Sequence, residues 1–90
     1  MTMYEILLQR QATRYYKRCG RDIAWRLAAC FTELEENPYG PDTKALRGKL
    51  QGARRCRVGG LRVVYEVHEE AKVVHVLAIL PRGNVYKKKN

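Results

Sequence analysis

The chain has 90 residues, enough for one domain with a modest core and no separate cofactor domain. Apolar residues make up 46% of it, too many for a disordered tail. No apolar run approaches the roughly 20 residues that span a membrane. The N-terminus lacks the basic flank and small-residue cleavage site of a signal peptide. We therefore expect a single domain over residues 1–90 and a cytoplasmic location.

The formal net charge of +9 is concentrated in one half of the chain. Residues 1–43 carry six basic and six acidic side chains, whereas residues 44–90 carry twelve basic and three acidic ones. Such an uneven excess favours a polyanionic partner: nucleic acid, a membrane surface or an acidic protein. A basic surface that only maintains solubility is the alternative.

Two helices are predicted in the first half of the chain, after a short strand over Met3–Leu8. In Gln9–Cys19, apolar residues recur at the i, i+3, i+4 and i+7 positions of one helical face. Gly20 ends this helix. A second helix begins at residue 21 or 22 and runs to Glu36, because Pro38 prevents its continuation. Together they form a predicted αα-hairpin.

The second half of the chain is predicted to be mostly β. The segment Asn37–Lys49, with two prolines and two glycines, is expected to be a loop. From Ala53 a strong hairpin pattern begins, with Gly59 and Gly60 suited to the two positive φ positions of a type I′ turn. A second turn is expected over His68–Lys72.

A third strand, Lys72–Leu80, is rich in β-branched residues and is expected at the centre of the sheet. The basic tail Arg82–Asn90 holds at most a short strand around residues 84–86. The predicted order is β-α-α-β-β-β. This is an α+β fold in which an N-terminal αα-hairpin packs on one face of an antiparallel sheet. The first strand is expected to pair with the last long strand.

The Gly-Gly hairpin places three arginines on one face of the sheet. A two-residue turn sets Arg57 opposite Arg62, and alternation brings Arg55 to the same face. The opposite, apolar face carries Cys56, Val58, Leu61, Val63, Tyr65 and Val67. Like charges directly opposed across strands are destabilising, and such a cost is expected at a functional site whose counter-charge is phosphate. The alternatives are a solvated face without a role, or a three-residue loop that moves Arg62 to the other face.

Metal and cofactor sites are not expected from the cysteine and histidine positions. Cys19, Cys30 and Cys56 lack C-x-x-C spacing, and His68 and His75 do not complete a zinc site. We expect free, buried or half-buried thiols in a reducing compartment. His75 is interpreted as a partly buried sheet residue and His68 as an exposed turn residue.

Five segments that together cover most of the chain carry a resemblance: MYEILL, ELEENPYGPD, KALRGKL, RRCRVGGLRVVYEV and VVHVLAILPRGNVY. Their order and spacing resemble the RelE family of bacterial toxins, within the RelE/ParE superfamily. The resemblance implies a metal-independent endoribonuclease that cleaves mRNA in the ribosomal A site. It also implies a RelB-like antitoxin as partner, contact with small-subunit rRNA and mRNA, no cofactor and no membrane partner.

The resemblance also implies a catalytic set, carried over by position as Arg55, Arg57, Arg62, Arg82 and Tyr86. The reaction would be attack of the RNA 2′-OH on the adjacent phosphorus, which expels the 5′-oxygen of the next nucleotide and gives a 2′,3′-cyclic phosphate. It needs a base, stabilisation of phosphate charge and help for the leaving 5′-oxygen. Tyr86 would act as base or stack on a nucleobase. Arg55, Arg57 and Arg62 would stabilise the phosphorane, and Arg82 would do the same or assist the leaving group. The Arg–Arg pair at 55 and 57 departs from the lysines of well-studied members.

Further basic residues are expected to contact rRNA phosphates: Arg47, Lys49, Lys87, Lys88 and Lys89. Two other functions remain open. One is a ParE-like, non-nuclease toxin that inhibits DNA gyrase, although ParE-like chains generally lack the arginine and tyrosine set. The other is a basic binding protein or an inactivated toxin.

Overall fold

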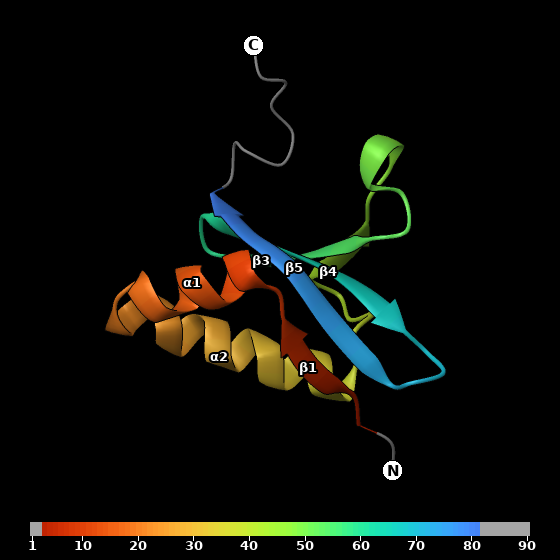
Figure 1. Cartoon of the computed structure of the whole chain (residues 1–90), viewed down its shortest axis with the longest axis horizontal. Helices are drawn as coiled ribbons and strands as arrows, with labels where there is room; N and C mark the ends of the chain where they lie inside the picture. Colours follow the sequence, from red (N-terminus) through yellow and green to blue (C-terminus); the bar gives the residue numbers. More distant parts are fainter. Residues whose placement is uncertain (1–2, 82–90) are drawn as a thin grey trace.

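The computed structural model describes residues 3–81, in which two helices pack against one face of a five-stranded sheet (Figure 1). The elements are β1 (Glu5–Leu8), α1 (Arg10–Arg18), α2 (Arg21–Glu36), β2 (Thr43–Ala45), the 3₁₀ turn η1 (Gly48–Leu50), β3 (Arg54–Val58), β4 (Leu61–His68) and β5 (Val73–Pro81). The predicted α+β class is confirmed. Neither described helix is long and apolar enough to cross a membrane. The predicted tail strand around 84–86 lies outside the described residues.

The helices form where the apolar spacing predicts them. Gly20 separates the two helices at a φ of 90°, in the region that glycine adopts most readily. The core is buried between this helix pair and the sheet. It contains Ala12, Leu27, Cys30, Phe31, Leu34, Cys56, Val63, Tyr65, Val74, Val76 and Ile79.

The sheet order is β1-β5-β4-β3-β2, and β1 pairs with β5 as expected. The direction of this pair differs from the predicted all-antiparallel sheet, because β1 runs parallel to β5, with Glu5 beside Val73 and Leu8 beside Val76. A parallel neighbour requires a long connection. The two helices and the intervening strands supply it, so the sheet is mixed.

The segment predicted as a loop over Asn37–Lys49 contains a short strand and the start of η1. Thr43–Ala45 forms β2 and pairs antiparallel with β3, from Thr43 beside Cys56 to Ala45 beside Arg54. Proline is confined to edges and strand starts in sheets, and Pro41 lies just before this edge strand. The loop prediction is therefore wrong for these three residues.

The hairpin register is as predicted: Val58 pairs with Leu61 and Arg57 with Arg62. The turn type differs from the predicted type I′. Gly59 has a φ of 58°, but Gly60 is not among the positive-φ residues of the described chain. Positive φ at the first central position alone is the pattern of a type II′ turn, which also matches the twist of paired strands.

The end of β5 runs past β1 and is held by helix α1 instead. β1 reaches only as far as Val76. Beyond it, the Gln11 side chain donates from Nε2 to the Ile79 carbonyl at 3.1 Å and accepts the Ile79 N–H on Oε1 at 2.9 Å. One amide side chain thus satisfies both backbone groups of Ile79, at an edge that no strand of residues 3–81 covers.

Candidate functional site

The sheet face turned away from the helices carries the three predicted arginines. On β3 and β4 the residues Cys56, Val63 and Tyr65 belong to the core. Alternation therefore turns Arg55, Arg57 and Arg62 to the opposite face. Because Arg57 and Arg62 are directly paired, the register places two guanidinium groups across from each other.

The three arginines differ in exposure. Arg55 and Arg62 are buried, at 8% and 4% relative exposure, whereas Arg57 is exposed. Arg62 Nη1 donates to the carbonyl of Leu61 at 3.3 Å, which orients its guanidinium group. Buried arginine keeps its charge, and a charge in a low-dielectric setting acts more strongly on a nearby anion. Arg57 is the member of the set that a bound phosphate can reach directly.

Lys44 is a fourth cation of this face that sequence analysis missed. β2 places Lys44 directly beside Arg55, so their side chains leave the same face. A hollow of about 250 Å³ opens here, lined by Pro41, Asp42, Thr43, Lys44, Arg55 and Arg57. The Asp42 carbonyl accepts the Arg57 N–H at 3.4 Å. The only sequence signal for Lys44 would have been a strand after Pro41, which the turn-rich composition concealed.

Arg54 points to the side of β3 that faces the core, like Cys56. It is therefore not part of the basic face, which is made of Lys44, Arg55, Arg57 and Arg62. Its Nη2 donates to Thr43 Oγ1 at 2.8 Å, and its guanidinium lies 5.0 Å from the ring centroid of Tyr39. Nearby, the buried Tyr65 hydroxyl donates to the Pro38 carbonyl at 2.6 Å. These contacts fix the loop that leads into β2, and so they position Lys44 and Asp42.

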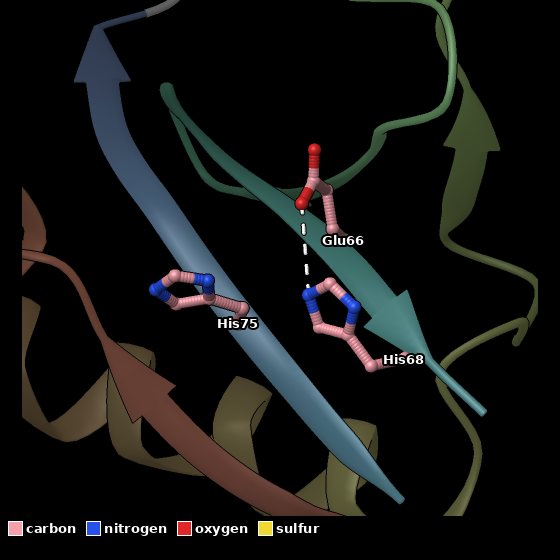
Figure 2. A group of neighbouring side chains, drawn as sticks. All are labelled: Glu66, His68 and His75. Atoms are coloured by element: carbon pink, nitrogen blue, oxygen red, sulfur yellow. Dashed lines mark ion pairs between the residues drawn. The ribbon is translucent and has the colours of Figure 1, made fainter. Parts of the chain in front are cut away.

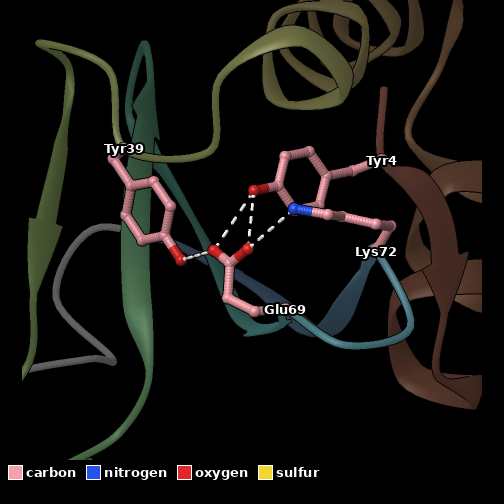
Figure 3. A network of polar contacts seen from close by, with 4 residues as sticks. All are labelled: Tyr4, Tyr39, Glu69 and Lys72. Carbon is pink, nitrogen blue, oxygen red and sulfur yellow. Dashed lines mark hydrogen bonds and ion pairs between the residues drawn. The ribbon is translucent and has the colours of Figure 1, made fainter. Parts of the chain in front are cut away.

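A network of polar side chains lies at the turn between β4 and β5, at the end of β4 away from Arg62 (Figure 3). Glu69, in the turn between β4 and β5, accepts hydrogen bonds from the hydroxyls of Tyr4 and Tyr39 and forms an ion pair with Lys72 at 3.2 Å. The hydrogen bond from Tyr39, then that from Tyr4, lowers the pKa of Glu69. The same bond to Glu69 raises the pKa of Tyr39 to about 12. The network joins the loop after α2 to the start of β1.

The cysteines are free thiols, and two of them meet in the core, as expected for buried or half-buried thiols. Cys30 on α2 donates to Cys56 on β3, with an Sγ–Sγ distance of 3.2 Å. This hydrogen bond, together with burial, raises the pKa of the Cys30 thiol, and it lowers the pKa of Cys56. Both thiols pack between the helix pair and the strand that carries Arg55 and Arg57.

The remaining predicted site residues fall into two groups. Arg47 and Lys49 are exposed at η1, which projects beyond the edge of the sheet (Figure 1). The others lie outside the described residues: Arg82, Tyr86, Lys87, Lys88 and Lys89. The structure thus brings together Arg55, Arg57 and Arg62 and adds Lys44.

Sequence comparison connects the chain with toxins. Residues 6–86 match the sequence profile of a family described as the ParE toxin of the type II toxin–antitoxin system parDE. No curated protein sequence matches the chain.

Solved structures of toxins share the fold. The RelBE2 toxin–antitoxin complex of Mycobacterium tuberculosis contains a chain with 26% identity and a TM-score of 0.78, covering 90% of this chain and 100% of that one. The archaeal RelE–RelB complex of Pyrococcus horikoshii gives 26% identity and a TM-score of 0.76, covering 91% and 98%. The isolated RelE toxin of E. coli, at 21% identity, has a TM-score of 0.75 and covers 97% and 88%.

Proposed function

Since the chain belongs to the ParE toxin family of type II toxin–antitoxin systems, we propose that this toxin is a ribosome-dependent endoribonuclease that cleaves mRNA in the A site. The observation that carries the proposal is the basic face, where β3 and β4 oppose Arg57 to Arg62 and β2 adds Lys44 beside Arg55. Four neighbouring cations on the sheet face turned away from the helices suit a phosphodiester better than a neutral or cationic ligand.

The residue types suit cleavage by the RNA's own 2′-OH without a metal. Arg57 would contact the scissile phosphate, because it is the exposed arginine of the face. Arg55 and Arg62 would stabilise the phosphorane through their charge, and arginine is too weak an acid to donate a proton at neutral pH. Arg82 would add to this stabilisation, and Tyr86 would act as the base or stack on a nucleobase.

The proposed partners follow from the same surface. An mRNA held in the ribosomal A site would lie on the basic face, and the ribosome would orient it. Arg47 and Lys49 at η1, with the tail lysines 87–89, would contact small-subunit rRNA phosphates. A RelB-like antitoxin would neutralise the toxin by blocking ribosome entry, and both would be cytoplasmic. The two solved complexes with 26% identity, each of a toxin with its antitoxin, support a partner of this kind.

Arg57→Ala tests the proposal most directly, since Arg57 is exposed and its truncation leaves the core intact. We expect about a 100-fold or greater loss of cleavage, the effect of removing one charge-stabilising donor from a transition state. Cleavage is measured by primer extension on translated mRNA after induction. The control is Arg21→Ala, which changes an exposed arginine at the start of α2, in the helix pair that packs on the other face of the sheet. Equal cleavage by wild type and Arg57→Ala would refute the site.

Three further variants extend the test to the rest of the set: Arg62→Ala, Arg82→Ala and Tyr86→Phe. Arg62 is buried, so its variant is compared only after its melting curve matches that of the wild type. Retained toxicity and mRNA cleavage in all three would refute the assignment.

A second candidate function is inhibition of DNA gyrase, because the matching sequence profile is that of ParE. Two assays, one of gyrase supercoiling and one of mRNA cleavage, distinguish the two functions. Inhibition of gyrase supercoiling with intact mRNA would favour the ParE-like activity. Cleaved mRNA with unaffected supercoiling would favour the endoribonuclease.

A further inference from the structure

Both histidines of the chain lie near the Glu66 carboxylate, on the sheet face turned away from the helices (Figure 2). Glu66 and His68 lie on β4, and His75 lies beside Glu66 on β5. Their possible ligand atoms all lie within 4.8 Å of one another. His68 Nε2 lies 3.6 Å from Glu66 Oε1, and the two imidazole centroids are 6.1 Å apart.

An irregularity in β5 brings this cluster together. Val64 pairs with Ala78, but Tyr65 pairs with Val76, so β5 has one extra residue at Leu77. A one-residue shift exchanges the two faces of a strand. Without the bulge, Val76 would stand beside Glu66 on the open face and His75 would point into the core. The bulge therefore buries Val76 and places His75 on the same face as Glu66.

We propose that Glu66, His68 and His75 bind a divalent transition-metal ion of the Zn²⁺ class, with a coordination position open to solvent. Two imidazoles and one carboxylate form a donor set that suits zinc and its neighbours, whereas Mg²⁺ prefers oxygen ligands alone. Tetrahedral zinc holds such ligand atoms about 3.3 Å apart. His68 and Glu66 are already close to this spacing, and their side chains, 50% and 42% exposed, have room to rotate.

The electrostatic setting separates this site from the basic face. Glu66 lies four residues along β4 from Arg62, about 13 Å at the rise of an extended strand. On the other side, β1 places Glu5 on the same face, beside Val73. The open face is therefore basic at one end and rich in metal-binding groups at the other, and the proposed metal lies outside the proposed cleavage site.

Calorimetric titration of the untagged, reduced 90-residue protein with ZnCl₂ tests the site, with MgCl₂ as the ion control. We expect one equivalent of Zn²⁺ to bind and Mg²⁺ not to compete. His68→Gln and His75→Gln should each weaken Zn²⁺ binding more than about tenfold, and Glu66→Gln should weaken it too. Glu70→Gln removes the same charge from the adjacent exposed turn and should leave affinity unchanged. Melting curves establish that each variant is folded.

Two further readouts exclude other sources of binding. Zn²⁺ at a hundredfold excess over its Kd should raise the melting temperature of the wild type by about 10 °C and leave that of His75→Gln unchanged. The Co²⁺ complex should lack a thiolate charge-transfer band, because the three cysteines are not ligands. The proposal is overturned if the wild type binds no Zn²⁺, if either folded histidine variant binds as tightly as the wild type, or if that band appears.

Discussion

Replacing Gln11 with alanine should destabilise the protein, because it removes the hydrogen bonds that hold the end of strand β5 to helix α1. The Gln11 amide makes two hydrogen bonds to the Ile79 backbone, at 3.1 and 2.9 Å. Each neutral hydrogen bond contributes about 1 kcal/mol net, so the loss of both should lower the free energy of unfolding by about 2 kcal/mol. For a domain of this size the melting temperature should fall by about 8–16 °C.

Urea denaturation followed by circular dichroism measures this loss, and the chain offers a matched control. Gln9 stands two residues earlier at the N-cap of α1, where its side chain makes no capping hydrogen bond. Gln9→Ala should therefore change stability by less than about 0.5 kcal/mol. A loss for Gln11→Ala no larger than that for Gln9→Ala would refute the reasoning, and the end of β5 would then be held by its pairing with β4 alone.

Two other substitutions test the turns. Hydrogen bonds from Tyr39, then from Tyr4, lower the pKa of Glu69 in the folded protein. Ionised Glu69 therefore stabilises the fold at pH values above its unfolded pKa near 4.5. This stabilisation is lost as the pH falls through the lower pKa of the folded state. The melting temperature of Glu69→Gln should therefore depend less on pH below about 4.5 than that of the wild type, and identical profiles would contradict the network. Gly59→Ala places a side chain at a φ of +58° and 3.3 Å from Arg26 Nη1, whereas a Cβ at Gly60 meets nothing within 4 Å. Gly59→Ala should cost about 1–2 kcal/mol in urea denaturation, and an equal cost for Gly60→Ala would argue against the observed turn.

The basic face shows how far local patterns can define a candidate site. The alternation of RRCRV and LRVVYEV around two glycines was enough to predict that Arg57 opposes Arg62. The inference holds because a hairpin is a local structure whose register depends on the turn length. The exposure of each arginine was not predictable, since it depends on segments distant in the sequence.

The sequence by itself determined the two helices and, for a two-residue turn, the hairpin register and the shared face of Arg55, Arg57 and Arg62, because each follows from spacing within a short segment. Only the tertiary structure decided the parallel pairing of β1 with β5, the strand that adds Lys44, and the bulge that places His75 on the same face as Glu66. These features depend on contacts between residues far apart in the chain. Their free energy comes from packing the whole sheet against the helices, which no local pattern records.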